Sequence, residues 1–270
     1  MDDWKEFLSR QKAGLKLKDF EGIYATAYQK QSHFLGHSTG LISKLINFLY
    51  PSECPSCGKE PDTFRIAPFC SACWSCIEKY SGPCCRICAT PFTSEDATIC
   101  AECMKNPPHF VKAMSFGLFN DTLATAIHFF KFQRIKRLQR PLGDLLDDFD
   151  ITGMDAVIPV PLSIRGLQER GFNQSLLLAK ILSDRTKVPL LMDGLMKKND
   201  TPPQLGLSRN ERRQNLKGVF ITKRKFPGMS LLLVNDVMTT GSTVNECSKE
   251  LLRAGAEKVS VLTLARANYL

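Results

Sequence analysis

"LLLVNDVMTTGSTVNE" occupies residues 231–246 and joins an apolar run to a polar turn. The apolar residues 231–234 are typical of a buried strand, and the Thr, Gly and Ser residues after Met238 are typical of a turn that leads into a helix. Such a turn offers backbone N–H groups, hydroxyls and the positive end of a helix dipole to an anion. The stretch therefore predicts a strand, a phosphate-binding turn and a helix that starts near Val244.

A purely structural alternative is that Ser242 and Thr243 only cap the helix. The apolar run ends in an acid, Asp236, and this favours a binding site over a simple cap. The preceding residue, Asn235, raises a question, because a second acid would be the more familiar choice for a site that binds a sugar and a metal.

Short apolar segments alternate with helical patterns from about Val111 onward, which predicts an α/β fold with a parallel sheet covered on both faces. Ligands of such sheets bind where the carboxyl ends of strands lead into helices. The expected strands are 155–161, 187–192, 230–235 and 258–265, and the expected helices are 121–132, 173–184 and 242–255.

Ten of the eleven cysteines fall between Cys54 and Cys103, and they include four C-x-x-C pairs. Twelve residues separate the first two pairs and eleven separate the last two, so the stretch contains two similar units. Two such pairs can complete one tetrahedral Cys₄ site, which predicts about two structural Zn²⁺ ions. The expected ligands are Cys54, Cys57, Cys70, Cys73, Cys85, Cys88, Cys100 and Cys103.

Two alternatives to this ligand set stay open. A disulfide framework requires an oxidising compartment, for which the sequence shows no export signal. The register is also open, because Cys76 can replace Cys73 and Cys84 can replace Cys85. We expect Cys247 to be a small buried residue.

Composition predicts a globular protein of the cytoplasm with a basic surface. The chain has 270 residues, 43% of them hydrophobic, and no apolar run reaches the roughly 18 residues of a membrane span. Its formal net charge is +9, and two Cys₄ zinc sites of net −2 each lower this value by four to +5. We expect an N-terminal extension at 1–40, a zinc-ribbon domain at 41–110 and the α/β domain at 111–270.

Two basic runs predict contact with a polyanion, although either run alone is also typical of a solvated face. Residues 197–225 carry nine basic and two acidic residues and are expected to form a mobile loop over the site. The candidate residues for binding nucleic acid are Lys131, Arg134, Lys136, Arg137, Arg209, Arg212 and Arg213.

The stretch 231–243 resembles the phosphoribosyl diphosphate (PRPP) signature of type I phosphoribosyltransferases, in which a strand ends in two acids and a threonine-rich phosphate loop follows. Together with "PVPLSIRGLQERGFNQSLLLAKIL" (159–182), "LSRNERRQNLKGVF" (207–220) and the cysteine module, it resembles the ComF family of competence proteins. The resemblance covers about residues 41–270, and the chain departs from the signature at Asn235.

The resemblance implies a PRPP site. Asn235 and Asp236 would face the ribose hydroxyls, and Arg165 and Arg170 would follow the diphosphate loop, which binds together with Mg²⁺. The 5-phosphate loop would comprise Thr239, Thr240, Gly241, Ser242 and Thr243, and the diphosphate loop Val160, Pro161, Leu162 and Ser163.

The function implied is a PRPP-binding protein that assists the uptake of single-stranded DNA in natural transformation, in contact with the membrane DNA-uptake machinery and its helicase. Two alternatives stay open: an active phosphoribosyltransferase with an unidentified acceptor, and a non-catalytic zinc-ribbon scaffold for nucleic acid or protein. No general base stands out in the sequence, so no catalytic residue is assigned.

Overall fold

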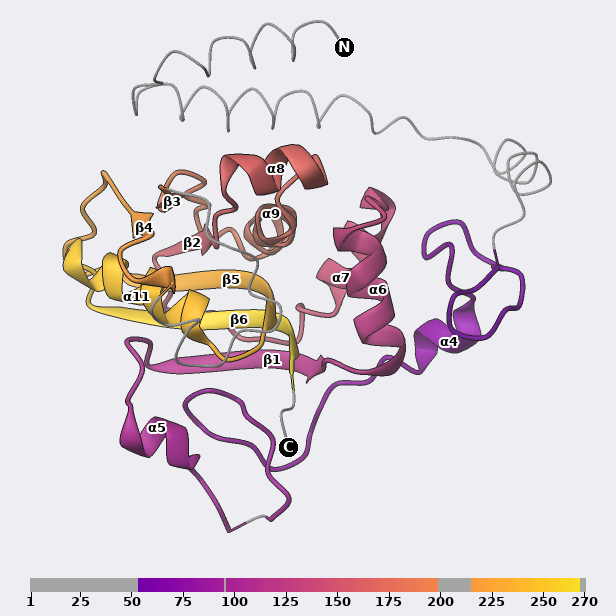
Figure 1. Ribbon diagram of the computed structural model, residues 1–270, viewed down its shortest axis with the longest axis horizontal. Coiled ribbons are helices and arrows are strands. Elements are labelled where there is room, and N and C mark those ends of the chain that lie inside the picture. The colour runs from indigo at the N-terminus through magenta and orange to yellow at the C-terminus, as the bar shows by residue number, and fades with distance from the viewer. Residues whose placement is uncertain (1–52, 95, 199–214, 268–270) are drawn as a thin grey trace, which may run out of the picture. The chain divides into compact units, whose positions relative to one another are not determined.

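The computed structural model describes residues 53–94, 96–198 and 215–267, and their main sheet has four strands in the order β1-β6-β5-β2 (Figure 1). Each neighbouring pair is parallel, which confirms the expected α/β class. The strands are β1 Lys112–Leu118, β2 Ala156–Pro159, β5 Ser230–Met238 and β6 Lys258–Arg266, beside a short antiparallel pair of β3 Met196–Lys197 and β4 Phe220–Ile221.

Helices follow the strands as the alternating pattern predicts. The longer ones are α6 Asp121–Lys131, α9 Gln174–Thr186 and α11 Ser242–Arg253. Shorter ones are α4 Ser71–Ser75, α5 Ala101–Lys105, the 3₁₀ turn η1 Lys136–Leu138, α7 Gln139–Asp144 and α8 Ile164–Arg170. Among the described residues, no helix is both long and apolar enough to cross a bilayer.

Side-chain alternation along the strands builds one apolar core on each face of the sheet. In β5, Leu232 and Val234 face a core shared with α6, α7 and α9, whereas Leu231 and Leu233 face a core shared with α11. All four side chains are fully buried, and truncating any of the three leucines to alanine would cost about 2–5 kcal/mol. A strand buried on both faces accounts for the unbroken apolar run in the sequence.

The two cysteine units join different cores. Cys54 and Cys70 pack in the core of α6, α7 and α9, and Cys85, Cys88 and Cys103 pack in the core of α11. Backbone hydrogen bonds continue this attachment along β1, where Tyr80 donates to the carbonyl of Phe116 at 2.8 Å and Ala113 donates to the carbonyl of Ile87 at 2.6 Å. The cysteine module is therefore packed against the sheet.

The structure differs from the sequence-based expectations at several elements. Residues 187–192 form only a single bridge, Leu190 to Val157, because Pro189 has no N–H to extend a ladder. Strand β1 was not expected, and α11 begins at Ser242, two residues before Val244. The expected extension at 1–40 and most of the expected loop at 197–225 lie outside the described residues.

Candidate functional site

The cysteines form two Cys₄ clusters, and within each cluster all four sulfur atoms lie within 4.8 Å of one another. Two of the sulfur separations are 3.7 Å, between Cys57 and Cys70, and 3.6 Å, between Cys88 and Cys100. Four sulfurs at about 2.3 Å from a tetrahedral zinc are about 3.8 Å apart, so both clusters fit Zn²⁺. Cys76 and Cys84 belong to neither cluster, so the two clusters comprise the eight expected cysteines, and zinc ligation by this set stays a prediction.

Each cluster includes the cysteine at the start of a short helix. Cys70 caps α4 and Cys100 caps α5, and each sulfur accepts a hydrogen bond from the N–H of the cysteine three residues later, at 3.5 and 3.4 Å. Backbone N–H groups of this kind are suitable donors to the sulfur ligands of a zinc site. Four thiolates leave no open coordination position, so zinc at these sites would be structural. Its binding would then contribute to the free energy of folding.

The second cluster is the more enclosed of the two. Cys85, Cys88 and Cys103 are buried, whereas Cys57 of the first cluster is exposed. Burial raises the pKa of Cys88, but the Thr90 hydroxyl, 3.1 Å from its sulfur, and the Arg266 guanidinium outweigh burial and bring the pKa down to about 7. Burial raises the pKa of the fully enclosed Cys247 well above its usual value, which fits the expected role as a core residue.

The parallel pairing of β2 with β5 brings the two expected PRPP loops to one edge of the sheet. Val160 donates to the carbonyl of Val234 at 2.9 Å, so residues 160–163 leave the sheet beside residues 235–243. Asn173, the N-cap of α9, donates to the carbonyl of Val160 at 3.0 Å, and Ser163 caps α8 by accepting from Gly166 at 3.1 Å. The turn at 160–163 is thus held from both sides.

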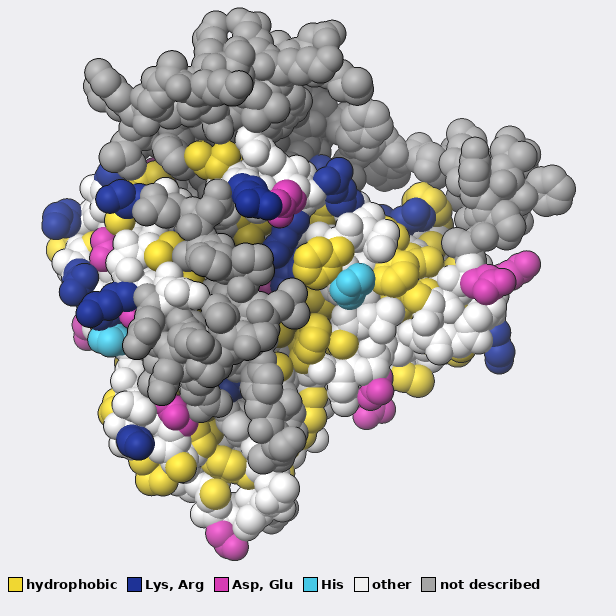
Figure 2. Space-filling view, viewed as in Figure 1, with side chains coloured by type: hydrophobic (Ala, Val, Ile, Leu, Met, Phe, Trp, Pro, Cys, Tyr) yellow, Lys and Arg dark blue, Asp and Glu magenta, His cyan; other side chains and the backbone are white. Residues whose placement is uncertain are grey.

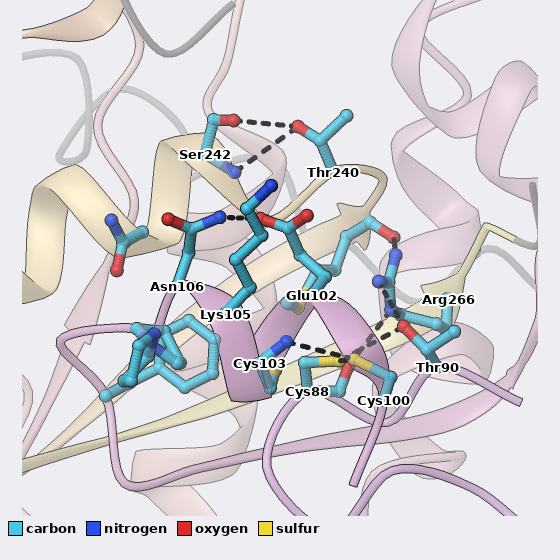
Figure 3. A pocket seen from close by; sticks show the side chains of 16 residues that line it. Cys88, Thr90, Cys100, Glu102, Cys103, Lys105, Asn106, Thr240, Ser242 and Arg266 are labelled. Atoms are coloured by element: carbon cyan, nitrogen blue, oxygen red, sulfur yellow. Dashed lines mark hydrogen bonds between the residues drawn. The ribbon is translucent and has the colours of Figure 1, made fainter. Parts of the chain in front are cut away.

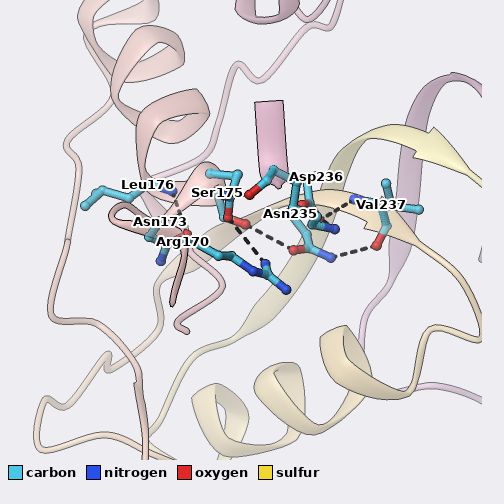
Figure 4. A network of polar contacts seen from close by, with 9 residues as sticks. Arg170, Asn173, Ser175, Leu176, Asn235, Asp236 and Val237 are labelled. Atoms are coloured by element: carbon cyan, nitrogen blue, oxygen red, sulfur yellow. Dashed lines mark hydrogen bonds and ion pairs between the residues drawn. The ribbon is translucent and has the colours of Figure 1, made fainter. Parts of the chain in front are cut away.

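The side chain of Asn235 is engaged within the protein (Figure 4). Its carbonyl accepts from the Ser175 hydroxyl at 3.0 Å, and its amide donates to the carbonyl of Val237 at 2.8 Å. A carboxylate could accept the first hydrogen bond but could not donate the second. These contacts give a physical reason for asparagine at this position, and contact between its amide and ribose hydroxyls stays a prediction.

Asp236 is paired with Lys131, one of the basic residues at 131–137 that were expected to bind nucleic acid. Lys131 Nζ lies 2.7 Å from Asp236 Oδ2, and the N–H of Val237 donates to Asp236 Oδ1 at 2.7 Å. Asp236 is only 6% exposed, so the ammonium is a neighbour of a largely desolvated carboxylate. Lys131, expected from its basic neighbours to contact nucleic acid, therefore lies at the sheet end beside the expected sugar-binding acid.

Residues 239–241 form the expected tight turn, and Ser242 and Thr243 are the first residues of α11. Gly241 is the N-cap with φ +80°, a backbone conformation that favours glycine, and a Cβ there would also lie 2.8 Å from the Met238 methyl carbon, which would have to move. Gly241 has no side chain to cap the helix; the Thr240 hydroxyl accepts from the N–H of Ser242 at 3.4 Å, so the expected caps Ser242 and Thr243 do not have that role. The hydroxyls of Thr240 and Ser242 lie 2.9 Å apart, beside the start of the helix (Figure 3).

A cavity of about 420 Å³ separates this turn from the second cysteine cluster (Figure 3). We call it the ribbon pocket. Its lining includes Thr90, Cys100, Glu102, Lys105, Asn106, Thr240, Gly241, Ser242, Asn245 and Arg266. Sequence analysis missed the contributions of α5 and Arg266, because no motif links residues so far apart in the chain.

The other candidate arginines lie on α8 and on the surface near α6. Arg165 Nε donates to Glu169 at 2.7 Å, and Arg170 Nη1 donates to Gln174 at 3.4 Å. Arg134 donates to the backbone carbonyl of Glu169. The expected residues Arg209, Arg212 and Arg213 lie outside the described residues.

Exposed aromatic rings lie beside several of these cations. The Arg137 guanidinium is 4.6 Å from the Phe64 ring centre, and the Arg170 guanidinium is 5.3 Å from that of Phe132. Phe64 is 45% exposed and Phe132 is 55% exposed. We call these four residues the aromatic–basic surface; Figure 2 shows hydrophobic and basic side chains side by side on the face in view.

Comparison with known proteins assigns the cysteine module and the family. Residues 45–104 match a family model described as a double zinc ribbon domain. Competence protein F of Haemophilus influenzae is 35% identical over 225 residues, which cover 79% of this chain and 90% of that protein. This chain belongs to the ComF family. Other ComF-like relatives are competence protein ComFC of Bacillus subtilis, 28% identical over 84% of this chain and 98% of that protein, and DNA utilization protein YhgH of Escherichia coli K12, 33% identical over 67% and 83%.

Solved structures that resemble this ComF-family chain include phosphoribosyl-handling enzymes. A glutamine PRPP amidotransferase from B. subtilis matches with TM-score 0.34 and 23% identity over 46% of this chain and 25% of that one. An adenine phosphoribosyltransferase matches with TM-score 0.31 and 18% identity over 52% of this chain and 84% of that one. At these scores the likeness carries no argument about the ligand.

Proposed function

We propose that this ComF-family chain binds PRPP with Mg²⁺ at the carboxyl ends of β2 and β5 and holds single-stranded DNA in the cytoplasm during natural transformation. The observation that carries the PRPP proposal is the parallel β2–β5 pair, which sets residues 160–163 beside the Gly241 turn. The names of the relatives, competence protein and DNA utilization protein, support the DNA part.

The chemistry of the sheet end suits a phosphorylated sugar. The turn at 239–243 supplies hydroxyls and helix N–H groups for the 5-phosphate, and Asp236 supplies a carboxylate for the ribose hydroxyls. Mg²⁺, when bound with the diphosphate, would neutralise its charge. Lys131 adds a fixed positive charge next to Asp236.

The aromatic–basic surface suits an unpaired strand. Bases of any sequence stack on exposed aromatic rings, while guanidinium groups contact phosphates and the ring faces. Phe64 and Phe132 are the exposed rings here, and Arg137 and Arg170 the cations. This supports sequence-tolerant binding of single-stranded DNA.

Calorimetric titration with PRPP, with and without Mg²⁺, tests the first part of the proposal. We expect the parent protein to bind, and Gly241→Ala to bind at least about 10-fold more weakly, because a Cβ would distort the turn at φ +80°. Gly228→Ala is the matched control, since Gly228 has φ +69° with open space where a Cβ would lie and precedes β5 at the opposite end of the strand. Absence of PRPP binding by the parent would refute the proposal.

A further inference from the structure

Arg266 ends strand β6 and is 4% exposed, although it is an arginine. Its side chain reaches in two directions. Toward the second cysteine cluster, Nε donates to the carbonyl of Cys88 at 3.0 Å and Nη2 donates to the Thr90 hydroxyl at 2.7 Å. Toward the phosphate turn, Nη1 donates to the carbonyl of Met238 at 2.9 Å and also to the carbonyl of Thr239.

The planar guanidinium thus joins two parts of the chain that are far apart in the sequence, the second cysteine cluster and the phosphate turn. Arginine is suited to this role because its donors point in fixed directions and it keeps its charge when buried. The hydrogen-bond partners of Arg266 are neutral oxygen atoms, so their positions matter: moving Cys88 and Thr90 would leave donors of a buried cation unsatisfied. The pairing of β5 with β6 supports these contacts, since it sets Arg266 directly opposite Met238.

A second contact joins the same two parts. His109, which follows the second cluster, donates its backbone N–H to Asn245 Oδ1 at 2.7 Å, and Asn245 lies in the first turn of α11. The ribbon pocket lies between these parts and includes both Asn245 and Arg266 in its lining. The first cluster differs, because Cys54 and Cys70 pack in the core on the opposite face of the sheet.

We propose that Arg266 is a positioning residue for the phosphate turn, and that it makes the geometry of that turn depend on the second Cys₄ cluster and not on the first. With its metal bound, the second cluster fixes Cys88 and Thr90, these fix the guanidinium, and the guanidinium fixes the carbonyls at the start of the turn. This inference rests on the proposed PRPP site for its functional consequence only; the mechanical coupling is independent of the ligand.

The experiment compares one mild substitution in each cysteine unit. Thr90→Val removes the hydroxyl that meets both Arg266 and the Cys88 sulfur while keeping the side-chain shape, and the zinc content shows whether the cluster itself is affected. Thr63→Val is the matched control in the first unit, where the Thr63 hydroxyl lies 3.2 Å from that of Ser71. Zinc content by plasma mass spectrometry, amide hydrogen exchange of residues 238–245 and PRPP calorimetry are measured on both variants of the full chain.

We expect Thr90→Val to keep the zinc content of the parent, to raise amide exchange at 238–245 by about 10-fold and to weaken PRPP binding by about the same factor, as for loss of one hydrogen bond to a charged group. Thr63→Val should change neither. Arg266→Lys, which keeps the charge but loses the fork, should behave like Thr90→Val.

Parental exchange at 238–245 in Thr90→Val and in folded Arg266→Lys would overturn the inference, as would an equal response in Thr63→Val. The exchange measurement does not need PRPP. If the parent binds no PRPP and exchange still responds only to Thr90 and Arg266, the proposed function fails and the coupling stands.

Discussion

Lys131, the last residue of α6, forms an ion pair with Asp236 in β5, with 2.7 Å between the ammonium nitrogen and the carboxylate oxygen. The side chains are 19% and 8% exposed, so water screens this pair much less than a surface pair. Any ligand that hydrogen-bonds to Asp236 meets a carboxylate whose charge is already balanced. The basic residues at 131–137 are therefore linked to the proposed sugar-binding acid through Lys131.

The pair predicts a large cost for removing the lysine alone. We expect Lys131→Met to lower the free energy of unfolding by about 3 kcal/mol, because it leaves a buried carboxylate unpaired, and the double variant Lys131→Met with Asp236→Asn to recover part of this loss. Urea denaturation at pH 7 measures both. Lys180→Met is the control, since the exposed pair with Asp184 contributes only about 0.5 kcal/mol. A loss equal to that of the control would contradict a buried pair.

A second prediction concerns asparagine at position 235. We expect Asn235→Asp to destabilise the chain by about 1–3 kcal/mol near neutral pH, because the carboxylate would face the Val237 carbonyl instead of donating to it. The loss should shrink as the pH falls, since a protonated carboxyl can donate to that carbonyl. Thermal or urea unfolding between pH 4 and 7 measures this.

The PRPP signature of type I phosphoribosyltransferases, which has an acid at this position, suggests that Asn235→Asp would improve ligand binding. A second acid would strengthen the attraction for Mg²⁺, and on that argument Asn235→Asp would bind PRPP more tightly in the presence of Mg²⁺. If the variant is as stable as the parent and gains Mg²⁺-dependent affinity in calorimetry, the hydrogen bonds to Ser175 and Val237 are not the reason for asparagine.

A third prediction tests the aromatic–basic surface. Phe132→Ala and Phe64→Ala should each weaken binding of a fluorescent oligo-dT by about 1–3 kcal/mol, the usual effect of losing one stacked base. Arg137→Gln with Arg170→Gln should lower the slope of log affinity against log salt by about 1.4, since each phosphate contact to a single strand contributes about 0.7. Anisotropy titrations at several salt concentrations measure both effects.

Phe119→Ala is the matched control for the stacking effect. Phe119 is 40% exposed, and it precedes α6 at the end of that helix opposite to Phe132. Equal losses in Phe119→Ala and Phe132→Ala would mean that exposed rings in general, and not this surface, contribute to binding. Parental affinity in both Phe64→Ala and Phe132→Ala would exclude stacking there.

The parts of this fold that the sequence predicts are those with local signals. Strand β5 has an unbroken apolar run because both of its faces are buried, and the turn at Gly241 needs a residue that tolerates a left-handed backbone. The cysteine pairs have the spacing that a tetrahedral metal imposes. Strand β1 lacks such a signal, because Lys112, Ser115 and Gly117 interrupt its apolar residues and its backbone is held by pairing with β6.

The contacts that organise the site depend on tertiary packing and have no local signal. Lys131 appears in the sequence as one of several basic residues, and only the packing of α6 brings it to Asp236. Arg266 ends an ordinary apolar strand, and nothing in "KVSVLTLAR" indicates that its guanidinium meets Cys88. A charged residue at the end of a buried strand is a weak hint, which becomes informative only once its neighbours are known.

The last prediction concerns the ligand register of the two clusters, where the chain supplies its own matched controls. Cys73 and Cys76 are three residues apart, and Cys84 and Cys85 are adjacent, yet only Cys73 and Cys85 have sulfurs within the clusters. We expect Cys73→Ser and Cys85→Ser each to lose about one zinc per chain in metal analysis, and Cys76→Ser and Cys84→Ser to keep both. Because a structural site contributes folding free energy, the first two variants should also melt at lower temperature. Full zinc content in Cys73→Ser together with loss in Cys76→Ser would show that the sulfurs exchange roles, and paired disulfides in place of metal would refute both sites.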